Sequence, residues 1–417
     1  MLFRFGYSTE SDIVFGKLMT RVRLILADFS TQSLIMGLLV AVVGFTGSFA
    51  IVLQGFRASG ATDQQAAAAL LAVSVAMGVA GIVLSLRTRM PVSVAWSTPG
   101  AVLLIGSGGA LGSFNEAVGA FIVCGALLLL CGLYRPLGRA IEAIPPSLAN
   151  AMLAGILLVI CLAPAKALVF DWTLALPVLL TWWIVAQFYR LYSVPAALLV
   201  LFALLIWKVG LPADFQTQLT QSLVPPVILI KPVFTLSAAI SIAFPLFIVT
   251  MASQNVPGIA VLRANHYKTK AAPLLTLTGF TSLVAAPFGS HAVNLAAITA
   301  AMCAGDDAHT DPQRRYWASL VAGLAYILIG VLAGAVTYTM TLVPTVLIEA
   351  IAGLALISAF SGSLVAAFKD VAEREAAAVT FLLSASGVTL AGIGGAFWGL
   401  LAGSAMLAFS RWRMSRN

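Results

Sequence analysis

Two runs of polar and helix-breaking residues interrupt apolar stretches of the chain, one at 91–100 and one at 285–294. In each run, residues suited to an extended strand lead into the start of a helix. We expect Thr98 to be the N-cap of the first helix, and Ser290 to cap a second helix that opens at His291. Unpaired backbone N–H groups at such helix starts bind anions, and a carboxylate is the natural occupant. Two ordinary Pro/Gly kinks, repaired by neighbouring helices, are the alternative interpretation.

Polar side chains also cluster within a long apolar span at 250–258. Pro257 cannot donate to the carbonyl of Ser253, which is therefore freed next to Gln254 and Asn255. Polar groups are costly in lipid, so these side chains should face a cavity or the interior of a helix bundle. Hydrogen bonding between helices is the alternative.

Aromatic side chains flank these polar groups. Trp96 and Phe288 precede the two expected helix starts, and Phe45 lies mid-span near Thr46 and Ser48. Any of the three rings could stack on an aromatic ligand, although core packing is an equal explanation for each. The candidate substrate-binding residues are Phe45, Thr46, Ser48, Trp96, Ser97, Thr98, Ser253, Gln254, Asn255, Phe288, Gly289, Ser290 and His291.

Composition defines the kind of molecule that must position these residues. Of the 417 residues, 61% are hydrophobic and only 9% are charged, with a mean hydropathy of +1.02. An ordinary soluble domain is excluded, so we expect a polytopic, all-α membrane protein. The first apolar run has no small-residue cleavage site before its end and is followed by many similar runs. It therefore indicates a transmembrane helix and not a removed signal peptide.

About fourteen apolar segments follow one another, and charged or turn-forming residues separate nearly all of them. The third and tenth segments combine a short strand with a half-length helix. Thirteen helical residues reach only ~20 Å against an apolar core of ~30 Å, so neither crosses alone. The expected ranges are 33–56, 66–86, 97–111, 114–133, 146–163, 173–189, 192–209, 237–262, 271–283, 290–304, 315–340, 344–368, 374–391 and 393–411.

If the fourteen segments cross the membrane in turn, the positive charges of the connecting loops lie mainly on one side of it. If both termini are cytoplasmic, every Lys and Arg falls inside except Arg57, Lys166, Lys208 and Lys231. That asymmetry follows the positive-inside rule. The net charge of +8 then reflects contact with anionic lipid headgroups and not with nucleic acid.

A faint internal repeat divides the chain into two halves. Seven segments per half is an odd number, so the second half must enter the membrane from the opposite side. This predicts a cytoplasmic arm at 1–32, a first inverted repeat at 33–210, a periplasmic loop at 211–235 and a second repeat at 236–411. Gly132, Pro146, Ala154, Gly155 and Leu158 recur, all shifted by 198 positions, as Gly330, Pro344, Ala352, Gly353 and Leu356.

Four motifs carry a resemblance to a known family: MASQNVPG at 251–258, WSTPG at 96–100, SASG at 384–387 and GGAFWGL at 394–400. With them the chain resembles the benzoate/proton symporters of bacterial inner membranes, which are distantly similar to the nucleobase and sulfate transporter folds. The resemblance implies a seven-plus-seven inverted repeat. Segments 1–4 and 8–11 would form a core domain carrying the site, and segments 5–7 and 12–14 a gate domain through which the fold dimerises.

The resemblance also suggests the sign of the substrate. In the nucleobase relatives an acidic residue on the eighth segment binds substrate, and Gln254 is the matching position here. Ser290 or His291 stands where the tenth segment has a carboxylate. Without these acids the site offers donors and dipoles, which suit an aromatic carboxylate.

Proton coupling has two candidate residues. His291 titrates near neutral pH, although a neutral histidine bound to substrate or backbone is the simpler interpretation. Glu349 lies inside an expected span, where a structural ion pair is the simpler interpretation. A substrate that carries its own proton needs neither. The cysteines lack metal or redox spacing, and no cofactor or metal is expected.

The sequence therefore predicts a secondary transporter that imports an aromatic carboxylate by proton symport. Another small organic anion or a nucleobase-like substrate on the same fold is the alternative. A membrane-embedded enzyme would need a catalytic cluster, and a channel a continuous polar stripe; neither pattern occurs in the spans.

Overall fold

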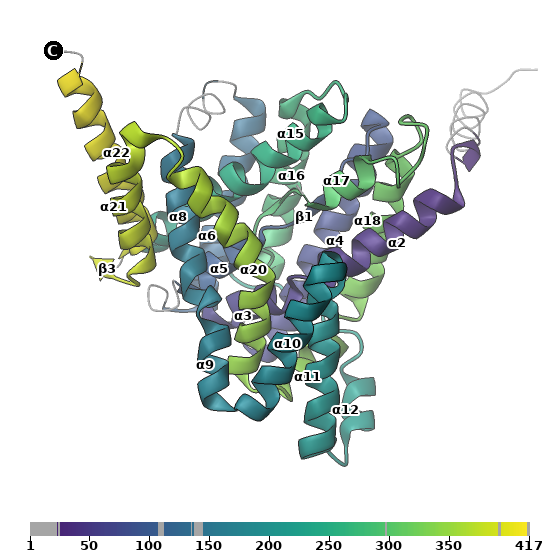
Figure 1. Cartoon of the computed structure of the whole chain (residues 1–417). Coiled ribbons are helices and arrows are strands. Elements are labelled where there is room, and N and C mark those ends of the chain that lie inside the picture. The colour runs from purple at the N-terminus through teal and green to yellow at the C-terminus, as the bar shows by residue number, and fades with distance from the viewer. Residues whose placement is uncertain are drawn as a thin grey trace, which may run out of the picture.

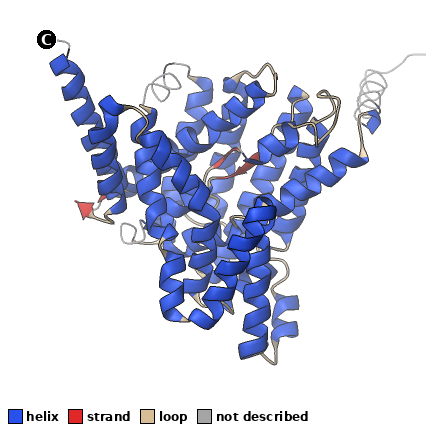
Figure 2. Ribbon diagram, viewed as in Figure 1, coloured by secondary structure: helices blue, strands red, loops and turns tan. Residues whose placement is uncertain are grey.

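Apolar runs become helices along most of the chain in the computed structural model (Figure 2). The structure describes residues 26–106, 112–134, 145–296, 298–390 and 393–414, together with Arg23 and Pro136. Most of the expected arm at 1–32 and the end of the third expected segment, 107–111, lie outside the described residues.

The first expected helix, 33–56, is divided into two. Helix α2 (Thr31–Thr46) ends before Gly47, and α3 (Phe49–Ala58) starts after Ser48. Ser48 has a non-helical backbone (φ −152°, ψ −1°), and this conformation interrupts the helix. Its side chain is therefore presented at a break in the span.

Helix α4 (Asp63–Thr88) starts with a capping box, in which Thr62 and Gln65 exchange side-chain-to-backbone hydrogen bonds. The half-length helix α5 (Thr98–Gly106) and the full-length α6 (Phe114–Leu133) follow. The first half of the chain then continues with α8 (Pro146–Cys161), α9 (Ala163–Phe170), α10 (Trp172–Phe188) and α11 (Ser193–Val209). The expected loop at 211–235 contains a short helix, α12 (Phe215–Gln221).

The span from Leu236 to Ala264 alternates between α and π geometry. After α13 (Leu236–Ala238) come a first π segment (Ala239–Ala243), α14 (Phe244–Thr250), a second π segment (Met251–Asn255) and α15 (Val256–Ala264). Pro245 and Pro257 stand at the second positions of α14 and α15. A proline has no N–H for the usual bond to the fourth preceding carbonyl, and each wider turn lies just before one.

The remaining helices complete the body. Helices α18 and α19 follow one another with a bend of 55° between them. The bounds are α16 (Ala271–Ala285), α17 (Ile298–Ala304), α18 (Tyr316–Val331), α19 (Ala333–Thr341), α20 (Thr345–Ala367), α21 (Arg374–Ala385) and α22 (Gly395–Met414).

The structure contains two small antiparallel sheets among its described residues. One joins segments far apart in the sequence, and the other joins adjacent segments. Strand β1 (Val94–Trp96) pairs with β2 (Val293–Leu295) near the middle of the molecule, where Figures 1 and 2 show it among the helices. Strands β3 (Thr389–Leu390) and β4 (Ile393–Gly394) pair between α21 and α22. In both halves of the chain, a strand thus precedes a half-length helix.

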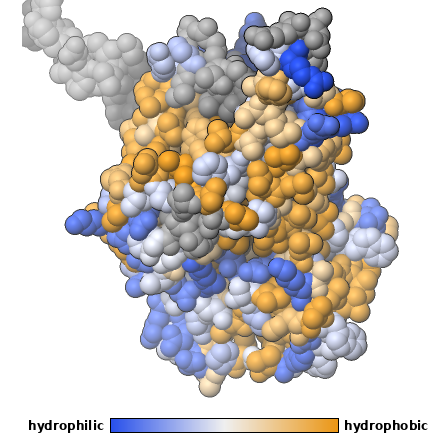
Figure 3. Space-filling view, turned by 90° about the vertical axis from the view of Figure 1, so that its left-hand side faces the viewer, coloured by the Kyte–Doolittle hydropathy of each residue, from blue (hydrophilic) through white to orange (hydrophobic). Residues whose placement is uncertain are grey.

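Seven helices in the described residues are long and apolar enough to cross a membrane, or eight if the bent α18–α19 pair is one span. Apolar side chains cover much of one face in the space-filling view, and hydrophilic ones gather toward its lower end (Figure 3). The protein is therefore a multi-pass membrane protein. The expected count of about fourteen includes short and half-length helices, so that number stays a prediction.

Helix pairs from opposite halves of the chain pack together. Helix α4 packs against α18, and α6 packs against α16. Gly78 and Gly323 permit the first approach, since a Cβ on either would lie within 2.8 Å of the other's carbonyl oxygen. In a second group of contacts, α8 packs against α20 and α21, while α10 pairs with α11 and α21 with α22. The β1–β2 sheet adjoins α4 and α16.

Candidate functional site

The β1–β2 pair brings the two interrupted spans together. Ala95 lies opposite Asn294 in the register. Beyond the strands, the Ser97 N–H donates to the Ala292 carbonyl at 3.0 Å, and the Ala296 N–H donates to the Ser93 carbonyl at 3.0 Å. Each strand thus holds the backbone that leads into the other's helix, so the two helix starts are fixed relative to one another.

The N-cap of α5 is Ser97, and the expectation of Thr98 was wrong by one residue. The Ser97 hydroxyl accepts the Gly100 N–H at 3.2 Å, and the Ser97 carbonyl accepts the Ala101 N–H at 2.9 Å. Thr98 is the first helical residue and is half-buried. Because Pro99 has no N–H, the N–H of Thr98 is the helix-start donor left over beside the cap.

The second half-length helix begins at Ile298, so the expected start at His291 was also wrong. Residues 293–295 form β2 because pairing with β1 gives their backbone groups hydrogen-bond partners at membrane depth. Ser290 is no helix cap: its buried hydroxyl donates to the His291 carbonyl at 3.0 Å. Gly289 takes up a left-handed turn with φ +86°, which glycine adopts without strain.

The chain from Thr250, the last residue of α14, to Asn255, the last residue of the second π segment, is hydrogen-bonded to both strand–helix junctions. At one end, the hydroxyls of Thr250 and Ser97 lie 2.8 Å apart. At the other end, the Asn255 side-chain oxygen accepts the Leu295 N–H at 2.9 Å. Asn255 is fully buried, so its acceptor holds the backbone of β2.

Gln254 and Ser253 lie between these two anchors. Ser253 donates to the Val249 carbonyl at 2.5 Å within its own helix. Both residues are half-buried, unlike Asn255. The π segment contacts β2 on one side and α8 on another. Among the described hydrogen bonds, Ser253 is thus fixed within its own helix and Asn255 to β2, while the Gln254 side chain makes none.

Aromatic residues gather at the break between α2 and α3. The Trp96 indole N–H donates to the Ser48 hydroxyl at 2.8 Å, and the Phe45 ring meets Trp96 edge-on with centroids 5.2 Å apart. Phe45 also stacks on Phe49. Thr46 donates to the Val42 carbonyl at 2.6 Å. The structure thus brings Phe45, Ser48 and Trp96 together one residue before the Ser97 cap.

His291 lies in an aromatic cluster. Its ring centroid is 5.3 Å from that of Phe56 and 6.3 Å from that of Phe121, and Phe114 packs edge-on against both phenylalanines. The residue is fully buried, Nδ1 lies 3.1 Å from the Ala292 carbonyl, and Nε2 has no hydrogen-bond partner. The neighbouring Phe288 is half-buried.

Four hydroxyl residues that sequence reasoning missed also fix the strands. Ser85 donates to the Val92 carbonyl at 3.3 Å, and Ser282 accepts the Val293 N–H at 2.9 Å. The hydroxyls of Ser93 and Thr299 lie 2.8 Å apart. Ser85, Ser93 and Thr299 each stand between two apolar neighbours, and that isolation is the signal that could have revealed them.

Glu349 lies on α20, away from these contacts. It is half-buried in the second turn, and Lys166 of α9 is its charged neighbour. Helices α9 and α20 pack against each other. No salt bridge to Glu349 occurs within the described residues, so the ion-pair interpretation stays a prediction.

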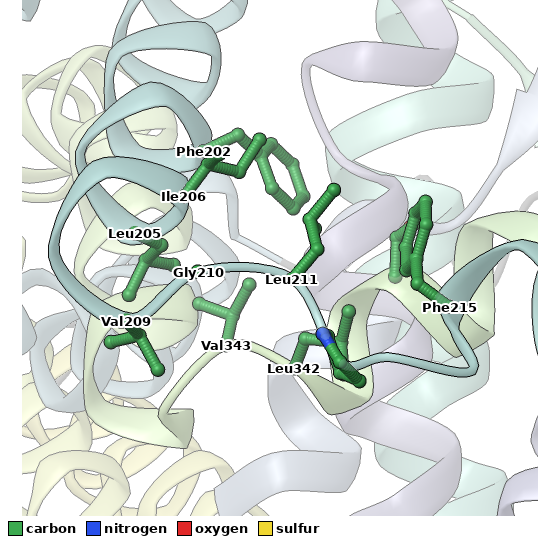
Figure 4. A pocket seen from close by; sticks show the side chains of 11 residues that line it. Phe202, Leu205, Ile206, Val209, Gly210, Leu211, Phe215, Leu342 and Val343 are labelled. Carbon is green, nitrogen blue, oxygen red and sulfur yellow. The ribbon is translucent and has the colours of Figure 1, made fainter.

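One pocket lies elsewhere in the described residues. It has about 890 Å³ of empty space, part of it open to the surroundings, and lies between the end of α11, the segment leading to α12 and the end of α19 (Figure 4). Phe202, Leu211 and Phe215 point into it from different segments. Its lining is mostly apolar, and it includes none of the candidate site residues.

Comparison with known proteins gives these contacts a context. The family model described as benzoate membrane transport protein (BenE) matches residues 27–409. The chain belongs to this family. It is 32% identical over 393 residues to the benzoate membrane transport protein of Acinetobacter baylyi, covering 94% of this chain and 97% of that one. It is 43% identical over 373 residues to inner membrane protein YdcO of Escherichia coli, covering 89% of this chain and 94% of that one.

Solved structures place this member of the BenE family in a wider fold group. The murine anion transporter Slc26a9 in its inward-facing state matches with a TM-score of 0.58 at 14% identity, over 99% of this chain and 74% of that one. The transmembrane domain of the cyanobacterial bicarbonate transporter BicA matches with a TM-score of 0.53 at 14% identity, over 90% and 97%. At such identity the likeness concerns the fold alone. The BenE-family chain is a membrane transporter with this fold.

Proposed function

We propose that this transporter imports an aromatic carboxylate of the benzoate class by proton symport across the bacterial inner membrane, with both termini cytoplasmic. The observation that carries the proposal is the juxtaposition of Trp96 with the Ser97 helix cap, which is held by Thr250 at the end of α14, directly before the π segment. An aromatic surface and a helix-start donor are thereby adjacent, as an aromatic acid requires.

In this proposal the carboxylate binds between the two half-helix starts. The free Thr98 N–H and the partial positive charge of the α5 start attract the anion, and α17 adds its first N–H groups. Gln254 supplies an amide donor from the second π segment. The ring packs against Phe45 and Trp96. Ser97 and Asn255 position these groups and do not contact the substrate.

We further propose that the helix pairs divide into a core and a gate. The core comprises α2–α6 and the chain from α13 to α19, and it carries the site. The gate comprises α8–α11 and α20–α22, through which two copies dimerise. Helix α4 of the first half packs against α18 of the second half, and α6 packs against α16. This pairing between the halves supports an inverted repeat. The π segment contacts α8, so the site adjoins the boundary between the two groups.

Uptake of labelled benzoate into proteoliposomes, with and without an inward proton gradient, tests the function. We expect saturable uptake that the gradient accelerates and that an excess of unlabelled benzoate suppresses. Uptake that saturates without response to the gradient would refute symport. Absence of saturable uptake in both conditions, from protein that is monodisperse, would refute transport of this substrate class.

A further inference from the structure

A second crevice lies between the proposed core and gate. It has about 450 Å³ of empty space, part of it open to the surroundings, and its walls come from α5, α8, the first π segment and the region joining α21 to α22. Much of this wall comes from the motifs at 384–387 and 394–400. Neither motif contains a residue of the proposed site.

The crevice lies farther along the same boundary as the proposed site. Helix α5 starts at the site with Thr98 and ends at the crevice with Gly106, and its 9 residues span ~13 Å. Ser241 lies on the crevice wall, and Thr250 lies at the site nine positions later. Nine helical positions again correspond to ~13 Å. Helix α8 contacts the second π segment and also lines the crevice. Helix α5, the span from Ser241 to Thr250 and helix α8 thus connect the crevice with the proposed site.

The lining combines apolar and hydroxyl groups. Leu103, Ile156 and Val388 give apolar walls, and no charged side chain lines the crevice within the part of the chain that the structure describes. Ser384 is 8% exposed, and its hydroxyl is buried without a hydrogen-bond partner. A buried hydroxyl without a partner costs free energy, which a bound acceptor or donor would recover.

We propose that this crevice is a second subsite for the aromatic acid, occupied on the route between the outside and the half-helix site. The proposal rests on the function proposed above. Apolar walls accept the ring, and the Ser384 hydroxyl hydrogen-bonds the carboxyl group. In the proposed orientation, α5 ends on the outer side of the membrane, so substrate reaches this subsite before the inner site.

Two pairs of tryptophan variants test the route. Val388 and Val159 line the crevice and are 54% and 38% exposed, so Val388→Trp and Val159→Trp narrow it from its rim. Leu390→Trp and Leu162→Trp are matched controls, because these exposed residues lie close by in the chain and do not line the crevice. We expect the two rim variants to reduce the initial rate of benzoate uptake about tenfold, equivalent to ~1.4 kcal/mol on the barrier, with both controls near wild type.

Equilibrium binding in detergent separates this subsite from the inner site. The rim variants should retain the wild-type Kd, since the half-helix site is intact. If the wild-type protein neither binds nor transports benzoate, the proposed function fails. If the wild type does both and the rim variants transport as fast as their controls, the second subsite is refuted.

Ser384→Ala gives an independent measurement. Removing a hydroxyl that has no partner should leave the Tm unchanged or raise it. A role in substrate passage predicts that the KM for uptake rises about fivefold, the loss of one hydrogen bond of ~1 kcal/mol. A purely structural serine predicts an unchanged KM, and that result would overturn the role assigned to Ser384.

Discussion

The hydroxyl oxygens of Ser97 and Thr250 lie 2.8 Å apart, and both residues are fully buried. The same Ser97 oxygen accepts the Gly100 N–H that starts α5. The contact therefore sets the position of the half-length helix relative to the end of α14, which leads directly into the π segment. In the proposed site, an error in this position would displace the Thr98 N–H that attracts the carboxylate.

Thr250→Val removes this contact while keeping the shape of the side chain. Because Ser97 still caps α5, we expect a folded protein that is less stable by ~0.6 kcal/mol, a typical value for a hydrogen bond between membrane helices. Benzoate affinity should fall several-fold as the helix start loses its register. Thermal unfolding and binding titration check both effects. Thr281→Val is the control, since Thr281 bonds only carbonyls of its own helix; an equal loss of affinity there would refute the positional argument.

Gln254→Ala should abolish benzoate binding while leaving a monodisperse protein of nearly wild-type Tm, because its half-buried side chain fixes no strand. Asn255→Ala should behave in the opposite way. It leaves the buried Leu295 N–H without its acceptor, at a cost of about 1–3 kcal/mol in stability. Thermal unfolding and titration with benzoate compare the two variants. Normal benzoate binding by Gln254→Ala would contradict the proposed site.

His291→Phe tests the proton-coupling role. The phenylalanine ring suits a cluster that already contains Phe56, Phe114 and Phe121, so folding and benzoate binding should survive. If His291 carries the coupled proton, the proton gradient no longer accelerates benzoate uptake. Counterflow exchange, which needs no gradient, serves as the control for a working transporter. Full acceleration by the gradient in the variant would exclude His291 as the carrier.

Glu349→Gln distinguishes the second candidate. Since Lys166 is the charged neighbour of Glu349, we expect a structural effect, with lower stability and gradient-driven uptake retained. Lys166→Met should lower stability in a similar way. Loss of gradient response in Glu349→Gln with unchanged stability would instead assign proton carriage to Glu349.

We expect the folding stability to depend on pH through Asp171, which lies between α9 and α10. Hydrogen bonds from Lys208 and Thr173 lower the pKa of this carboxyl from 3.8 to about 2. The ionised form is therefore favoured by folding, so its contribution to stability is present above pH 3.8 and is lost as the pH falls toward 2. Asp171→Asn should lower the Tm at pH 7 and lower it much less at pH 2. An equal loss of Tm at both pH values would contradict the ion pair.

Several features of the site were readable in the sequence. Proline and glycine interrupt apolar runs at 91–100 and 285–294, and a strand does precede a half-length helix in both places. The helix starts were misplaced, by one residue at Ser97 and by seven at Ile298. Capping preferences identify residue types that can start a helix. They do not say where strand pairing with another segment will delay that start.

Composition and apolar periodicity alone determined a helical membrane protein with two broken spans, because lipid permits few other structures. Tertiary structure decided which polar residues serve as anchors and which stay available. Asn255 and Gln254 are neighbours with similar side chains, yet only Asn255 meets a strand N–H. Its partner, Leu295, is 40 residues away, and the β1–β2 pairing that presents this N–H joins segments about 200 residues apart. No local pattern encodes such a contact, because hydrogen-bond partners at this distance exist only once the helices have packed.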